Sequence, residues 1–136
     1  MAGLLDTGFL LAILDADDDL HEICVAALQE EPQPLLPDVV LPELAFMILR
    51  ELGYPTLTNF LRSLAAGELV IVRMTSQDLE QTAVVLEKYA DSRVDFVDCA
   101  IAVMAERLNL KRVLTVDRRH FELFRPKHCA AFEIAP

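Results

Sequence analysis

Three aspartates stand where a parallel α/β protein would bind a ligand. Asp6 follows the apolar run Gly3–Leu5 and Asp117 follows the apolar run 113–116, so both are expected at the carboxyl edge of a sheet. Asp98 opens a helix predicted over residues 99–108. Taken one at a time, turn formation or helix capping is the simpler explanation of each aspartate. Their chemical interest depends on whether they meet.

Two further acids sharpen the question. Asp95 precedes Asp98 by one helical turn. Glu43 is the one charged residue of the stretch 39–49, which is otherwise apolar and which we interpret as a largely buried helix. An ionised carboxylate there is costly unless it pairs with a cation or binds a metal. A partner arginine or a solvent-facing position would explain Glu43 equally well.

Clustered carboxylates favour a particular kind of chemistry. Like charges held close together repel and raise one another's pKa, and a divalent cation between them removes that penalty. A ligand set made only of oxygen atoms suits Mg²⁺ or Mn²⁺. Such ions acidify water and stabilise the attacking and leaving oxygens of a phosphodiester. The acids therefore predict metal-dependent phosphoryl chemistry.

The elements that would position these acids can be predicted from hydrophobic patterning. Buried strands are expected where short apolar runs occur, and helices where apolar residues recur at helical spacing. The predicted strands cover Gly3–Leu5, 69–72, 113–116 and 132–134, and the predicted helices cover 20–28, 39–52, 56–66, 76–89 and Phe96–Leu108. Pro34–Pro37 is interpreted as a connection, with a short strand as an alternative. Alternating strands and helices imply a three-layer α/β/α sandwich around a mainly parallel sheet of about 4–5 strands.

Length and charge limit the classes of protein. The 136 residues fit one domain over 1–136, and 54% hydrophobic with 25% charged residues is a globular composition. The net charge of −10 argues against binding nucleic acid or anionic membranes through bulk positive charge. Residues 1–68 carry 12 acids and two bases, whereas residues 69–136 carry 10 of each. The segment 111–127 is locally basic.

Cysteine and histidine usage suggests no competing chemistry. Cys24, Cys99 and Cys129 lie far apart and show no zinc-ligand spacing, so we expect reduced thiols in a cytoplasmic protein. No secretory signal pattern is evident, and the apolar runs are too short to span a bilayer. His120 lacks an obvious second basic partner in the sequence and is interpreted as structural.

Taken in order, the acidic motifs resemble those of the PIN domain family, and within it the VapC-type toxins of type II toxin–antitoxin systems. The resemblance covers essentially the whole chain. Its motifs are Asp6-Thr7-Gly8-Phe9-Leu10, Pro42-Glu43-Leu44, Phe96-Val97-Asp98-Cys99-Ala100 and Leu114-Thr115-Val116-Asp117-Arg118-Arg119-His120-Phe121. Cys99 departs from the pattern, because alanine is more usual there.

The resemblance implies a PIN-like fold and an endoribonuclease that uses Mg²⁺ or Mn²⁺. Asp6, Glu43, Asp98 and Asp117 would be the catalytic and metal-binding residues, with Asp6 and Asp98 as the firmest ligands. Asp95 is an accessory candidate one turn from Asp98, and the resemblance does not define its role. From the residues alone, Thr115 is as well explained by strand preference as by a hydrogen bond to a ligating carboxylate.

The resemblance also implies partners: an RNA substrate, a cognate antitoxin protein and a second copy of the chain in a homodimer. Arg118 and Arg119 are candidate RNA-binding residues beside Asp117. A solvated surface or an antitoxin contact explains these two arginines at least as well. The apolar helices over 39–52 and 56–66 offer a surface for an amphipathic antitoxin segment.

Other functions fit the sequence less well. A response-regulator receiver would need paired acids after the first strand and a lysine where Asp117 stands. A haloacid-dehalogenase-type phosphatase would need an aspartate at Gly8. A non-catalytic binding module with the same fold, and a stand-alone RNA-processing nuclease, remain as alternatives.

Overall fold

The computed structural model describes residues 2–136, and residue 1 lies outside the described residues. Within that range the strands are β1 (Gly3–Leu5), β2 (Pro34–Pro37), β3 (Val70–Val72), β4 (Arg112–Leu114) and β5 (Glu133–Ala135). The α-helices are α1 (Thr7–Leu14), α2 (His21–Glu30), α3 (Leu41–Leu52), α4 (Tyr54–Ala65), α5 (Ser76–Lys88), α6 (Phe96–Leu108) and α7 (Arg118–Leu123). Two short 3₁₀ helices, η1 (Asp38–Val40) and η2 (Ala90–Ser92), complete the elements.

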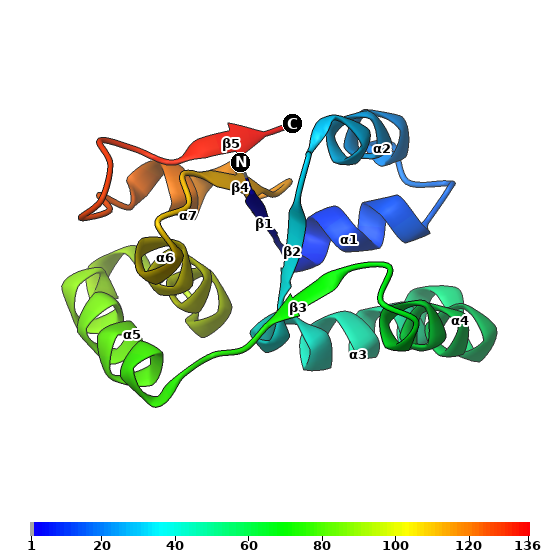
Figure 1. Ribbon diagram of the computed structural model, residues 1–136, viewed down its shortest axis with the longest axis horizontal. Coiled ribbons are helices and arrows are strands. Elements are labelled where there is room, and N and C mark those ends of the chain that lie inside the picture. The colour runs from blue at the N-terminus through cyan, green and yellow to red at the C-terminus, as the bar shows by residue number, and fades with distance from the viewer. Residues whose placement is uncertain (1) are drawn as a thin grey trace.

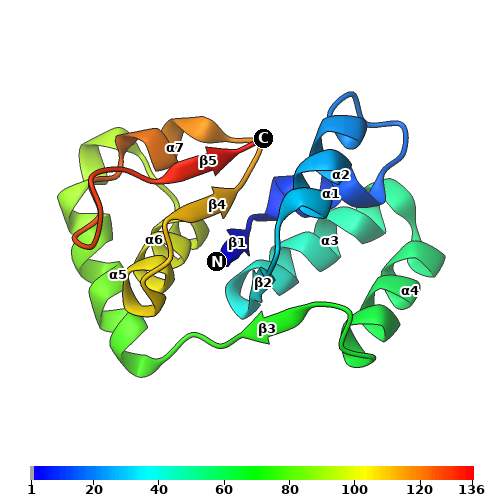
Figure 2. The ribbon, with the colours of Figure 1, turned by 45° about the horizontal axis from the view of Figure 1, so that its top comes forward.

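The strands of residues 2–136 form one five-stranded sheet in the order β3-β2-β1-β4-β5, and every pairing in it is parallel. Helices α1 to α4 lie on one side of the sheet and α5 to α7 on the other (Figures 1 and 2). The predicted α/β/α architecture with a parallel sheet is thereby confirmed. Because the chain winds outward in both directions from β1 and β4, the strand order reverses between these two strands, and such a reversal opens a crevice at their carboxyl ends.

The centre of the sheet is its most buried part. Leu4 and Leu5 of β1 pair with Val113 and Leu114 of β4, and none of the four is exposed to solvent. Gly3 is required beside them, since a Cβ there would lie 2.6 Å from Leu114 Cδ1. Burial of this kind on both faces explains why these strands are continuous apolar runs in the sequence.

Two predicted elements are less buried than the sequence suggested. The predicted helix over 39–52 is divided into η1 and α3, and α3 buries Leu44 and Ile48 but leaves Glu43 and Phe46 exposed. The prediction of an all-round buried helix was therefore wrong, because one side of α3 faces solvent. The strand predicted as buried over 69–72 is the edge strand β3, with Val70 and Ile71 exposed.

Two elements were not clearly predicted. Pro34–Pro37 forms β2, inside the sheet, although proline cannot donate a hydrogen bond to a neighbouring strand and is uncommon there. Arg118–Leu123 forms α7, which is too short for helical periodicity to reveal. This short helix matters because it follows Asp117 directly.

Helices α5 and α6 begin with side-chain caps. Thr75 and Asp78 exchange hydrogen bonds in a capping box at the start of α5. Asp95 caps α6 by accepting a hydrogen bond of 2.8 Å from the backbone N–H of Asp98. Asp98 is thus in the first turn of α6, and its carboxylate is not the cap. In residues 2–136 we found no helix long and apolar enough to cross a membrane.

Candidate metal centre

A pocket opens at the carboxyl edge of the sheet, beside the ends of β1 and β4. Five acidic residues line it, contributed by five places in the chain: the ends of β1 and β4, the first turns of α3 and α6, and the residue that caps α6. They are Asp6, Glu43, Asp95, Asp98 and Asp117. The structure therefore brings the four predicted catalytic residues and the accessory acid into one pocket.

Asp6 is buried and held by two hydrogen bonds. The backbone N–H of Thr7 donates to Oδ1 at 2.8 Å, and the hydroxyl of Thr115 donates to Oδ2 at 2.7 Å. The Thr115 hydroxyl also accepts a hydrogen bond of 3.1 Å from the backbone N–H of Asp117. One buried hydroxyl thus links the two acids that follow β1 and β4. Each oxygen of Asp6 keeps a lone pair for a further ligand.

Asp98 projects from the first turn of α6 and is almost completely buried. Its Oδ2 lies 2.5 Å from Nδ1 of His120, on α7. His120 was interpreted from the sequence as a structural residue without a role in the site, yet it touches a predicted metal ligand. The signal that would have found it is its place three residues after Asp117, which becomes informative only when the segment is recognised as a helix returning to the pocket.

Glu43 and Asp117 lie at the more open side of the pocket. Glu43 projects from the first turn of α3 and is exposed. Asp117 caps α7, with Oδ1 3.4 Å from the backbone N–H of Arg119 and 3.4 Å from its Nε. These two carboxylates are therefore accessible to a substrate, whereas Asp6 and Asp98 form the buried base of the pocket.

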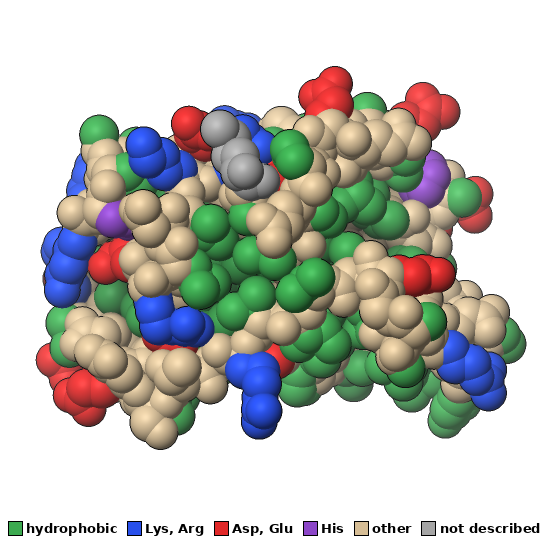
Figure 3. All heavy atoms as spheres, viewed as in Figure 1, with side chains coloured by type: hydrophobic (Ala, Val, Ile, Leu, Met, Phe, Trp, Pro, Cys, Tyr) green, Lys and Arg blue, Asp and Glu red, His purple; other side chains and the backbone are tan. Residues whose placement is uncertain are grey.

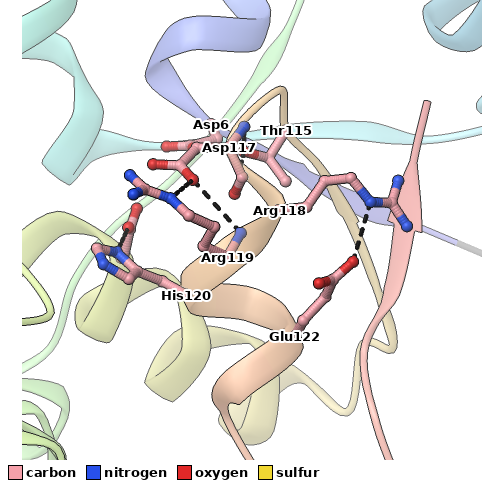
Figure 4. A network of polar contacts seen from close by, with 8 residues as sticks. Asp6, Thr115, Asp117, Arg118, Arg119, His120 and Glu122 are labelled. Carbon is pink, nitrogen blue, oxygen red and sulfur yellow. Dashed lines mark hydrogen bonds and ion pairs between the residues drawn. The ribbon is translucent and has the colours of Figure 1, made fainter. Parts of the chain in front are cut away.

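The two candidate RNA-binding arginines point in different directions (Figure 4). Arg118 contacts Glu122 at 3.1 Å and donates to the backbone carbonyl of Pro136 at 2.8 Å, away from the acids. Arg119 turns toward the pocket, and its side chain is 84% exposed. Arg118 is thus held away from the acids, whereas Arg119 is largely exposed and makes a long ion pair of 3.4 Å with Asp117.

Burial and mutual repulsion disfavour the charged forms of these acids. Burial raises the pKa of Asp6, and the charges of Asp95 and Asp117 raise it further, against the two hydrogen bonds that lower it. Burial, together with the charges of Asp6 and Asp95, raises the pKa of Asp98 to about 7, although the contact with His120 lowers it. The pKa of Glu43 is raised by burial, by Asp95 and by Asp6. A cation bound between these acids would lower the pKa of all three.

The donor set fits a divalent cation. In residues 2–136 the Asp95, Asp98 and His120 side chains each offer a ligand atom, and these atoms lie within 4.8 Å of one another. The Thr7 hydroxyl, which lines the same pocket, is buried and has no hydrogen-bond partner within the described chain. A hydrated cation would supply that missing partner. Burial and the charges of Asp95 and Asp98 raise the pKa of the neighbouring Cys99 thiol to about 12, which disfavours the nucleophilic thiolate.

Charge is unevenly distributed between the two halves of the molecule. On the face seen in Figure 3, most Lys and Arg side chains lie over the half of the molecule built from α5 to α7. This distribution agrees with the sequence, in which the first half carries the whole net negative charge.

Comparison with known proteins agrees with the geometry. The family model of the PIN domain matches residues 3–125. Ribonuclease VapC26 of Mycobacterium tuberculosis is 31% identical over 134 residues, which cover 98% of this chain and 99% of the relative. The crystal structure of M. tuberculosis VapC20, described as a Sarcin-Ricin loop cleaving toxin, has a TM-score of 0.76 at 18% identity and covers 83% of this chain and 87% of its own. A toxin–antitoxin complex from Klebsiella pneumoniae has a TM-score of 0.69 at 17% identity, covering 88% and 89%.

The chain is a member of the PIN domain family, and the matched residues 3–125 include all five acids of the pocket. Within that family its full-length similarity to VapC26 assigns it to the VapC toxins. The predicted resemblance is confirmed, and the receiver and haloacid-dehalogenase alternatives are excluded.

Proposed function

We propose that this protein is the ribonuclease toxin of a toxin–antitoxin pair and cuts RNA at a divalent-cation site built by Asp6, Glu43, Asp98 and Asp117. The observation that supports the proposal most strongly is that these four acids converge where the strand order reverses. The pKa values of Asp6, Glu43 and Asp98 are raised there, and a cation would lower them. The relatives reported above include a ribonuclease and an RNA-cleaving toxin.

The ion would be Mg²⁺ or Mn²⁺, because the proposed ligands are carboxylate oxygens. When bound, such an ion acidifies water and offsets charge on phosphate oxygens. Asp6 and Asp98 would hold it at the buried base of the pocket, with the oxygens of Asp6 oriented by Thr115 and the Thr7 backbone. Asp117 would complete the site from the rim.

The remaining residues would act on the substrate. Glu43 is exposed and has a raised pKa, which suits it to hold a water molecule and accept its proton. Asp95 keeps α6 in place by capping it and adds negative charge behind Asp98. Arg119 would contact a phosphate of the RNA, since its guanidinium faces the pocket and is solvent-exposed.

Substitution of the buried acids tests the activity. Asp6→Asn and Asp98→Asn should each abolish Mg²⁺- or Mn²⁺-stimulated RNA cleavage, whereas Asp91→Asn, which removes an exposed acid of η2, should leave it intact. Mapping RNA ends after induced expression of the wild type and of Asp98→Asn identifies the target. Full, metal-stimulated cleavage by either buried-acid variant would refute the proposed site.

The two arginines form a matched pair for testing the RNA contact. Arg119→Glu should weaken RNA binding and reduce its salt dependence, because a phosphate contact is lost. Arg118→Glu should affect RNA binding less, because Arg118 is engaged by Glu122 and Pro136. Equal effects of the two substitutions on the salt dependence would remove Arg119 from the proposed interface.

The partner would be an antitoxin whose amphipathic segment covers exposed apolar side chains of α3 and α4, among them Phe46, Tyr54 and Leu61. We further propose that residues 1–136 act as one nuclease domain, as a homodimer in the cytoplasm. Co-purification with the product of a neighbouring small reading frame tests whether an antitoxin binds, and Phe46→Glu should weaken that binding. Light scattering of the purified toxin tests the homodimer.

A further inference from the structure

His120 contacts Asp98 from outside the lining of the acidic pocket. It lies on α7, and its Nδ1 is 2.5 Å from Oδ2 of Asp98 on α6. The two side chains are only 18% and 8% exposed, so water competes little for this contact. The contact joins α7 to α6, and the two residues that make it are 22 positions apart in the sequence.

When Asp98 is ionised, as it must be to bind a cation, its carboxylate can only accept, so Nδ1–H of His120 donates in this hydrogen bond. The other charged groups facing Asp98 are the carboxylates of Asp6 and Asp95, which when ionised can only accept. Among the residues that the structure describes, the imidazole is the side chain that donates to the Asp98 carboxylate, through Nδ1–H. Oδ2 of Asp98 is therefore engaged, and Oδ1 is left for another partner.

The short contact also separates two roles for His120. Nδ1 of His120 is engaged by Oδ2 of Asp98, so this nitrogen is not turned toward a cation. Asp98 lines the acidic pocket, whereas His120 is not among the lining residues. The arrangement thus matches a histidine that supports a ligand rather than one that joins it on the metal.

We propose that His120 is a positioning residue of the metal site, which holds Oδ2 of Asp98 so that Oδ1 faces the cation. The inference rests on the proposed function, since it presupposes a cation between Asp6 and Asp98. Donation from a neighbouring side chain fixes the carboxylate rotamer before the cation arrives, and supporting contacts of this kind raise metal affinity about 10- to 100-fold.

Mn²⁺ binding to the full-length protein tests the inference, measured by calorimetry and by the paramagnetic resonance signal of free Mn²⁺. His120→Leu should weaken Mn²⁺ binding about tenfold or more. His120→Asn should retain most of the affinity, because its amide N–H₂ reaches the position of Nδ1. His21→Leu is the matched control: its Nδ1 also makes a hydrogen bond, of 2.8 Å to the carbonyl of Ala12, but on a different helix outside the pocket.

Two further measurements separate positioning from other roles. In an Asp98→Asn background, His120→Leu should cause no additional loss, since His120 acts through Asp98. Pulsed resonance on wild-type protein with Mn²⁺ should detect no directly coordinated nitrogen. This last measurement needs no variant, so it remains decisive if His120→Leu fails to fold.

The outcomes distinguish a failure of the positioning role of His120 from a failure of the proposed metal site. Mn²⁺ affinity unchanged in His120→Leu, or a directly bound nitrogen in the wild type, would overturn the positioning role while leaving the metal site standing. Wild-type protein that binds no Mn²⁺ would overturn both. Weakened binding in His120→Leu, rescue by Asn, and no effect of His21→Leu would establish the inference.

Discussion

The hydroxyl of Thr115 is the point where a minimal change should disturb the site most clearly. Thr115 is buried, donates to Oδ2 of Asp6 at 2.7 Å and accepts from the backbone N–H of Asp117 at 3.1 Å. Thr115→Val keeps the shape of the side chain and its strand preference but deletes both hydrogen bonds. It therefore isolates the contribution of one oxygen atom to the geometry of two acids.

The expected size of the effect follows from these two bonds. A hydrogen bond to a charged group contributes about 1.5–3 kcal/mol. If the whole of this energy stabilised only the Mn²⁺-bound state, its loss would weaken Mn²⁺ binding by about 10- to 150-fold, which is the upper limit of the effect. Asp6 keeps its bond from the Thr7 backbone, so we expect about a tenfold loss. The unpaired N–H of Asp117 should lower the free energy of unfolding by about 1–3 kcal/mol.

Calorimetric titration with Mn²⁺ measures the first quantity and urea unfolding without metal measures the second. Thr115→Ser is the control, because it retains the hydroxyl and loses only a methyl group. The reasoning is refuted if Thr115→Val binds Mn²⁺ as tightly as Thr115→Ser, since Asp6 would then need no support from β4.

Three further predictions concern stability and local geometry. Because the folded, metal-free chain holds a proton on Asp98 between its ordinary pKa of 3.8 and about 7, the free energy of unfolding should fall as the pH rises through this window. Asp98→Asn should reduce that slope in urea unfolding with a chelator present, while the raised pKa values of Asp6 and Glu43 retain part of it, and an unchanged slope would contradict the assignment. Gly8→Ala places a Cβ 2.9 Å from Val116 Cγ2, and the crowding should lower the free energy of unfolding by about 1–3 kcal/mol, offset by about 1 kcal/mol gained in helix propensity. Thermal melting should show that adding Val116→Ala restores stability. If it does not, the strain lies elsewhere. Arg107→Leu removes the 2.9 and 3.0 Å hydrogen bonds to the buried Asp78 carboxylate and should lower the free energy of unfolding, measured in urea, by about 3–5 kcal/mol. Arg50→Leu breaks the exposed ion pair with Glu51 and should change the free energy of unfolding by about 1 kcal/mol or less. Similar losses in the two variants would argue against burial as the cause.

Much of the fold could be predicted from hydrophobic patterning, because its central elements are buried on all sides. β1 was predicted with the observed bounds, and so was α6. The peripheral elements were harder. β3 has an apolar sequence like that of a buried strand, but its place at the edge of the sheet depends on how the chain crosses over, which local pattern does not encode. β2 begins and ends with proline, which by local propensity indicates a connection.

For the candidate site, residue types were more informative than burial. The acids at positions 6, 43, 95, 98 and 117 were all singled out, and they line one pocket. The sequence argument for Glu43 relied on a buried helix, however, and Glu43 is exposed. Its pKa is raised by neighbours from other elements as well as by burial. His120 was missed for a related reason: its contact with Asp98 spans 22 residues and depends on α7.

The pairing of β1 with β4 has a consequence for when the protein becomes active. The first strand of the chain is completed on one side only by residues 112–114, and the acids that follow the two strands are linked by a hydroxyl of residue 115. A growing chain on the ribosome cannot assemble the pocket until nearly all of it has emerged. An incomplete copy that lacks residues 112–117 therefore has neither the strand beside β1 nor Asp117, and it cannot form the pocket.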